Sequence, residues 1–113
     1  MSKILNVEEA NGLVIISTQG YLNKDLGEEI QKVSTEYVDK GSTSFLLNLS
    51  QSNIVNSIGA SIIIELIEKL QEVNGSLSFC ELPSIIEKTF KIMGLTKYCD
   101  TYENQEAALE QLT

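Results

Sequence analysis

The chain lacks three residue types that many enzymes and nucleic-acid-binding proteins depend on: it contains no histidine, no arginine and no tryptophan. Without histidine there can be no Ser-His catalytic pair and no imidazole metal ligand. Without arginine there is no bidentate phosphate clamp and no arginine finger. These absences argue against most hydrolytic and phosphoryl-transfer enzymes, so we expect a non-enzymatic protein with no catalytic residues, no metal ligands and no cofactor.

Acidic residues outnumber basic ones, since sixteen aspartates and glutamates stand against eight lysines, for a formal net charge of −8. Binding to nucleic acid or to anionic membranes needs a basic surface, so this balance argues against both. No apolar run reaches membrane-spanning length, because Glu65 and Glu68 interrupt the longest apolar cluster. The first residues also lack the basic and then apolar pattern of a signal peptide. We therefore expect a cytoplasmic protein.

The chain holds only two cysteines, Cys80 and Cys99, which form no CxxC pair. Isolated cysteines usually behave as small buried apolar residues, so we predict two reduced thiols in the core. A length of 113 residues suits one domain with one core, which assigns residues 1–113 to a single domain.

Segments typical of strands alternate with segments typical of helices. β-Branched and apolar runs predict strands at residues 5–9, 13–18, 45–49, 76–80 and 98–101. Apolar residues at helical spacing predict helices at residues 24–39, 59–73 and 84–93, and a last one after residue 104. Residues 20–23 and 50–53 are predicted to be loops. This order predicts an α/β fold, with a mixed sheet of about four to five strands and about four interspersed helices.

Polar residues at the predicted helix boundaries indicate how the helices begin and end. Asn23 and Asn104 are each placed to cap a helix, and Ser84 with Glu87 has the spacing of a capping box. Gly94 is placed to end the third helix. The run 45–49 predicts a buried central strand, whereas the alternation in 76–80 predicts a half-buried one. The helical residues predicted to face the core are Leu26, Ile30, Val33, Tyr37, Ile62, Ile63, Leu66, Ile67, Leu70, Val73, Ile85, Ile86, Thr89, Phe90 and Met93.

The stretch from residue 53 to residue 70 passes from a polar loop into a strongly apolar helix, and Ser57 lies at the transition. Its side-chain oxygen could cap the helix, or its hydroxyl could accept a phosphoryl group that faces the positive end of the helix dipole. Asn56 is either a turn residue or a residue that positions the Ser57 hydroxyl. Gly59 permits close packing or a sharp start of the helix, which would leave Ser57 accessible.

Residues 48–60, Asn-Leu-Ser-Gln-Ser-Asn-Ile-Val-Asn-Ser-Ile-Gly-Ala, resemble the signature of the STAS domain as found in bacterial anti-sigma-factor antagonists. In that family an apolar strand ends in Asp/Asn-Leu-Ser, and a turn of the Asp-Ser-Ser/Thr-Gly type opens a long helix. Residues 20–23, 75–80 and 92–95 resemble three further family segments in the same order. The resemblance covers nearly the whole chain and implies a single STAS-type domain.

The resemblance implies a binding protein that is switched by phosphorylation. In such antagonists the serine after the signature's acidic position, here Ser57, is phosphorylated by an anti-sigma factor that is itself a serine kinase. The unphosphorylated antagonist binds the anti-sigma factor and frees the sigma factor, and a PP2C-type phosphatase restores this form. We expect a monomer or a weak dimer. The partner-binding residues that the resemblance implies are Tyr21, Leu22, Asn23, Asn53, Asn56, Ser57, Ile58, Gly59 and Ser61.

Three positions depart from the family pattern. Asn56 and Asn23 stand where aspartate is common, and Ile58 replaces the usual second Ser/Thr. These departures give weight to an alternative, a non-phosphorylated STAS adaptor or accessory subunit of a transporter or stress-sensing complex, in which Ser57 only caps the helix. Tyr21 and Leu22 also keep two interpretations, because they either staple the following helix to the core or contact the partner. A nucleotide binder is disfavoured, since the sequence has no glycine-rich phosphate loop.

Overall fold

The computed structural model describes residues 3–113, which contain five strands, four α-helices and one short 3-10 helix. The elements are, in order, β1 (Ile4–Ala10), β2 (Leu13–Leu22), α1 (Lys24–Asp39), β3 (Ser44–Val55), α2 (Ser57–Glu72), β4 (Ser76–Cys80), α3 (Ser84–Met93), the 3-10 helix η1 (Leu95–Lys97), β5 (Thr101–Tyr102) and α4 (Gln105–Leu112).

The strands form one sheet in the order β1-β2-β3-β4-β5. β1 and β2 are antiparallel and are joined by a tight turn at Asn11 and Gly12, where φ is 50° and 85°. Every other neighbouring pair is parallel and is joined by a helical connection, as a parallel pair requires. The sheet is therefore mixed and β3 is its central strand, which confirms the predicted fold class.

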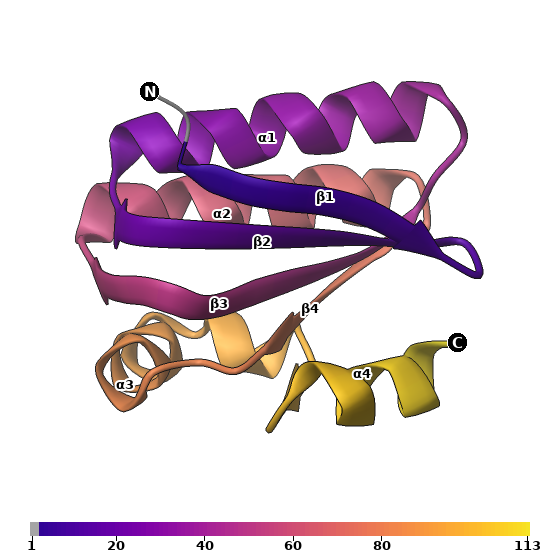
Figure 1. Cartoon of the computed structure of the whole chain (residues 1–113). Coiled ribbons are helices and arrows are strands. Elements are labelled where there is room, and N and C mark those ends of the chain that lie inside the picture. Colours follow the sequence, from indigo (N-terminus) through magenta and orange to yellow (C-terminus); the bar gives the residue numbers. More distant parts are fainter. Residues whose placement is uncertain (1–2) are drawn as a thin grey trace.

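Helices cover the two faces of the sheet unequally. On one face α1, α2 and α3 form the main core, in which the rings of Phe79 and Phe90 lie 5.0 Å apart, centroid to centroid. On the other face α4 covers a smaller cluster. Figure 1 shows α1 and α2 alongside one another and α4 well away from both. The smaller cluster consists of Leu13, Ile15, Leu46, Cys80 and Ala108.

Several predicted boundaries are confirmed. α1 has the predicted bounds, and the Asn23 side chain caps it by accepting a hydrogen bond from the Leu26 N–H at 3.1 Å. Asn104 caps α4 in the same way, through the Ala107 N–H at 2.8 Å. Gly94 ends α3 in the left-handed conformation, with φ 85°.

β2 and β3 are longer than predicted, so the loops predicted at residues 20–22 and 50–53 are wrong. Tyr21 pairs with Ile54 and Leu22 with Val55 in a parallel ladder. Gln51 and Ser52, whose polar side chains suggested a loop, pair with Gln19 and Gly20 in the same ladder, and this pairing satisfies their backbone groups. Gly20, with φ 78°, lies where the register of the ladder shifts, which is typical of a bulge.

α3 begins without the predicted capping box. Pro83 precedes the helix, its carbonyl accepts the Glu87 N–H at 2.9 Å, and Ser84 is already the first helical residue. The Ser84 side chain therefore cannot act as the cap. Ile85 is also not a core residue, because it is 57% exposed and lies a quarter-turn from the buried Ile86.

Three smaller expectations are corrected in the same region of the sheet. Val73 is exposed because it follows the last turn of α2 and lies beyond the buried Leu70. β4 is buried at residues 77–80 and not at alternate positions, because helices cover both faces of the sheet there. The last strand is shorter and later than predicted, since η1 takes residues 95–97 and β5 contains only Thr101 and Tyr102.

Candidate functional site

The first turn of α2 is capped by Asn56 and not by Ser57. The Asn56 backbone is extended, with φ −107° and ψ 172°, and its Oδ1 accepts a hydrogen bond from the Gly59 N–H at 2.7 Å. This is the geometry of an N-cap residue. α2 therefore starts at Ser57, two residues earlier than predicted. The interpretation of Ser57 as the cap is wrong, and Asn56 is a cap and not a turn residue.

Ser57 is exposed in the first turn of α2. Within residues 3–113, its hydroxyl makes no hydrogen bond to another residue. A serine at a helix start usually contributes through its side-chain oxygen, but here Asn56 already performs that task. The hydroxyl of Ser57 is thus free of a structural role and faces solvent.

The start of α2 rests directly on the end of β2. The Asn56 N–H donates to the Leu22 carbonyl oxygen at 3.2 Å. A Cβ atom at Gly59 would lie 2.2 Å from the same oxygen, so a side chain there would force the two elements apart. Gly59 is therefore required for the close approach that places Ser57 beside the end of β2.

Four of the residues that the resemblance implied for partner binding have mainly structural contacts, namely the cap Asn56, the buried Gly59, Leu22 and Asn23. The Leu22 side chain is fully buried in the main core, in agreement with the alternative that it staples α1 to the sheet. Asn23 is half-buried, and its Oδ1 is engaged by the Leu26 N–H. Neither side chain is presented to a partner as freely as Ser57 is.

Three large apolar side chains lie exposed around Ser57. Tyr21 and Ile54 are directly paired across β2 and β3 and are 36% and 42% exposed, and Ile58 is 54% exposed in the first turn of α2. Ile54 was missed by the sequence reasoning, because residues 50–53 were predicted to be a loop that ends next to it. We refer to the exposed residues Tyr21, Ile54, Ser57, Ile58 and Ser61 as the Ser57 surface. Asn53, also exposed, borders it.

The Ser57 surface contains no acidic or basic side chain, although the whole chain has a net charge of −8. The backbone N–H groups of Ser57 and Ile58 lie at the start of α2, where a helix has unpaired donors and the positive end of its dipole. The arrangement can therefore bury apolar area against a partner. It can also accommodate an anionic group on Ser57 without unfolding α2.

The two thiols are poorly suited to redox or nucleophilic chemistry. Both are buried and neither forms a disulfide. Burial raises the pKa of Cys80 to about 12, with the neighbouring Glu81 carboxylate adding to the effect. Burial likewise raises the pKa of Cys99 to about 12, assisted by Asp100. At neutral pH both groups are therefore protonated and unreactive.

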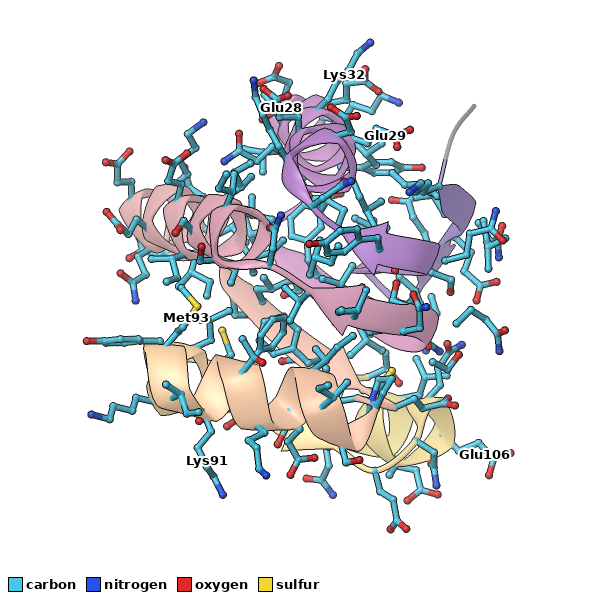
Figure 2. The ribbon with its side chains drawn as sticks, turned by 90° about the vertical axis from the view of Figure 1, so that its left-hand side faces the viewer. Glu28, Glu29, Lys32, Lys91, Met93 and Glu106 are labelled. Atoms are coloured by element: carbon cyan, nitrogen blue, oxygen red, sulfur yellow. The ribbon has the colours of Figure 1, made fainter. Side chains whose placement is uncertain are left out.

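A groove, a metal site or a membrane span could also carry function in the described residues. A groove between α2 and α3, into which Met93 points (Figure 2), is lined mainly by apolar residues and lies toward the other end of α2. In residues 3–113 there is no group of three or more histidine, cysteine, aspartate or glutamate side chains that could hold a metal ion. Within this described part of the chain, no helix is long and apolar enough to span a membrane.

Comparison with known proteins identifies the family to which this fold belongs. The model of the STAS domain family matches residues 5–108. BtrV of Bordetella bronchiseptica, which is provisionally named an anti-sigma factor antagonist, is 27% identical over 104 residues, or 92% of this chain and 90% of BtrV.

Two solved structures share the same architecture. A Thermotoga maritima protein, also provisionally named an anti-sigma factor antagonist, superposes with a TM-score of 0.85 at 19% identity, covering 94% of this chain and 92% of its own. The phosphorylated form of SpoIIAA from Bacillus superposes with a TM-score of 0.74 at 21% identity, covering 96% of this chain and 98% of its own. At these identities the likeness establishes the fold.

The fold and the site together define a small α/β domain with exposed apolar and serine side chains at the capped start of its second helix. The chain belongs to the STAS domain family.

Proposed function

We propose that the protein is an anti-sigma-factor antagonist, a non-enzymatic regulator that binds an anti-sigma factor through the Ser57 surface. Membership of the STAS domain family and the similarity to BtrV, which is provisionally named as such an antagonist, support this function. The observation that carries the proposal is that Asn56 caps α2 and leaves the exposed Ser57 hydroxyl without a structural role.

In this proposal Ser57 is phosphorylated by a kinase-type anti-sigma factor and dephosphorylated by a PP2C-type phosphatase. SpoIIAA, which shares the fold, has been solved in a phosphorylated form. A phosphoserine adds nearly two negative charges at one point. Placed among Tyr21, Ile54 and Ile58, that charge would be desolvated in a complex that buries their apolar side chains. The cost of burying an unpaired charge weakens the complex.

Phosphorylation would act locally and would leave the domain folded. The phosphate lies next to the N–H groups that open α2, which favour an anion. Asn56 is uncharged, so it adds no carboxylate to repel the phosphate. The switch therefore changes the surface that the partner meets and not the fold.

Ile58 favours one alternative. Because this apolar residue, 54% exposed, stands beside Ser57, the same surface also suits a permanent apolar contact. In that case the chain is a STAS adaptor, or an accessory subunit of a transporter or stress-sensing complex, that binds without being phosphorylated.

Binding of a candidate kinase-type anti-sigma factor from the same genome, measured by calorimetry, tests the antagonist function. We expect the wild-type protein and Ser57→Ala to bind equally, and Ser57→Glu to bind at least about tenfold more weakly, since one buried charge costs more than about 1.4 kcal/mol. Ser76→Glu is the matched control, because Ser76 is an exposed serine beyond the opposite end of α2, outside the Ser57 surface. Equal binding by Ser57→Glu would favour the adaptor, and absence of binding by every form would contradict the antagonist function.

A further inference from the structure

A polar network holds the start of α4 against the sheet, on the face opposite α1 and α2. Asn48 of β3 is only 8% exposed, and its Nδ2 donates to Gln105 Oε1 at 2.9 Å and to Glu81 Oε2 at 3.4 Å. The same Glu81 oxygen accepts the backbone N–H of Gln105 at 3.1 Å, and Gln105 Nε2 donates to Glu8 at 3.4 Å. We call Asn48, Glu81 and Gln105 the latch, because they join β3, β4 and α4.

The latch holds Glu81 in an unfavourable backbone conformation. Its φ is 55°, in the left-handed region that residues other than glycine seldom occupy. Such a residue persists only when its surroundings fix it. Here the fixing contacts are the bonds to Asn48 and Gln105 and the bond from the Glu81 N–H to the Tyr102 carbonyl, at 3.2 Å. Release of α4 would therefore also relieve strain at Glu81.

α4 has little else to hold it. It has eight residues, and a helix of that length is not stable alone in water. Ala108 is its one fully buried residue, whereas Leu109 and Leu112 are only partly buried against the smaller cluster. Docking of α4 therefore depends on the latch to a degree that docking of α1 and α2 does not.

Asn48 also contacts Ser50, in the part of β3 that leads to the Ser57 surface. Its Oδ1 accepts the Ser50 N–H at 2.9 Å, at the point where the register between β2 and β3 shifts. One carboxamide group thus holds α4 through its nitrogen and Ser50 of β3 through its oxygen. Loss of the Gln105 contact leaves the nitrogen with only the longer bond to Glu81, at 3.4 Å, so the carboxamide is held less firmly and its bond to Ser50 weakens.

We propose that α4 is a detachable cover of the sheet, and that its release through the latch loosens residues 50–56, which lead into the Ser57 surface. The device gives a second route by which that surface can be altered, from the opposite face of the sheet. The proposal goes beyond antagonist function and needs no binding partner, so it can fail or succeed independently.

Hydrogen exchange of individual amides in the full chain tests this device, with Gln105→Ala compared with the wild type. We expect exchange of the α4 amides and of the Ser50 amide to rise about threefold to tenfold, the factor that one hydrogen bond provides. Amides of α1 and of the centre of β2 should keep their rates. Glu106→Ala is the matched control, because Glu106 is exposed and points away from the sheet (Figure 2).

Thiol labelling supplies a second readout, since Cys80 lies beneath α4 and Cys99 lies in the main core. Gln105→Ala should speed labelling of Cys80 and leave that of Cys99 unchanged. Faster exchange of α4 with an unchanged Ser50 amide would contradict the coupling. A uniform rise over the whole chain, or equal acceleration of both thiols, would contradict the detachable cover. Asn48→Ala, which removes both contacts, should raise Ser50 exchange further than Gln105→Ala.

Discussion

The helices α2 and α4 begin alike and differ in the role of the residue after the cap. Asn56 and Asn104 each accept a hydrogen bond from the backbone N–H three residues later, at 2.7 Å and 2.8 Å. The next residue of α2 is Ser57, which is exposed and makes no side-chain bond within the described residues. The next residue of α4 is Gln105, whose side chain and backbone join it to β3, to β1 and to Glu81 just after β4.

The difference shows how one local motif can serve two purposes. An asparagine cap satisfies the helix start by itself, so the first helical side chain is available for another role. At α2 that side chain is left to solvent and can undergo chemistry, whereas at α4 it fastens the helix to the sheet. Substitutions near the two helix starts and in the cores beside them test this difference, and we expect Gly59 to give the largest effect.

Substitution of Gly59 should damage the α2 start most. In Gly59→Ala the new Cβ would meet the Leu22 carbonyl oxygen at 2.2 Å, and backbone would have to move. We expect a loss of about 3 kcal/mol in the free energy of unfolding, measured with urea. Gly27→Ala is the matched control, because the atoms nearest to its Cβ would be those of the Ile62 side chain, at 3.1 Å, and not backbone. Equal stability of the two variants would contradict the close approach of α2 to β2.

The region beneath α4 should respond to alkaline pH. Burial raises the pKa of Cys80 and Cys99 to about 12, so unfolding allows each thiol to ionise at lower pH. The stabilisation is fully present below the unfolded pKa of about 9 and is lost as pH rises toward 12. Between about pH 8 and about pH 10.5 we expect each thiol to account for about 2 kcal/mol of lost unfolding free energy.

Urea unfolding of the wild type and Cys80→Ala at both pH values measures the Cys80 share. The variant should lose less stability over this interval than the wild type. Cys99→Ala provides the comparison for the main core. An identical loss in the wild type and Cys80→Ala would show that the Cys80 thiol does not remain protonated in the folded state.

Removal of each cap should show how much its helix contributes to the global stability of the domain. We expect Asn56→Ala to lower the free energy of unfolding by about 1 kcal/mol, because it leaves the Gly59 N–H without its partner. Asn104→Ala should affect global stability less and act mainly on α4, which exchange of the α4 amides would reveal. A larger global loss for Asn104→Ala than for Asn56→Ala would contradict the view that α4 is the weakly held element.

The smallest effect is expected for Ser57→Ala. If Asn56 is the cap, loss of the Ser57 hydroxyl should change the free energy of unfolding by no more than about 0.5 kcal/mol. If Ser57 were the cap, the loss would be about 1 kcal/mol, as for Asn56→Ala. Thermal unfolding of the two variants side by side distinguishes these results.

Sequence patterns sufficed where side-chain spacing alone decides the structure. The apolar stripe of residues 24–39 and the cap at Asn23 were enough to predict the bounds of α1, since an amphipathic helix depends mainly on its own residues. The polar residues 50–53 were predicted as a loop because their place in β3 depends on pairing with β2, which local sequence does not encode.

The cap of α2 was assigned to the wrong residue for a related reason. Asn56 and Ser57 are both favourable cap residues, and only the position of α2 on Leu22 decides between them. The resemblance placed Ser57 correctly at the start of the helix but could not show that its hydroxyl is unused. The exposure of Ile54 and the hydrogen bonds of the latch were not predicted either, because both depend on contacts between distant parts of the chain.

In our proposal the exposed Ser57 is the residue that is phosphorylated. Intact mass after incubation with ATP and a candidate anti-sigma kinase from the same genome tests it most directly, on the wild type, Ser57→Ala and Ser61→Ala. We expect the wild type and Ser61→Ala each to gain one phosphate, and Ser57→Ala to gain none. Phosphorylation of Ser57→Ala, or binding of the kinase by the wild type with no gain in mass, would contradict it.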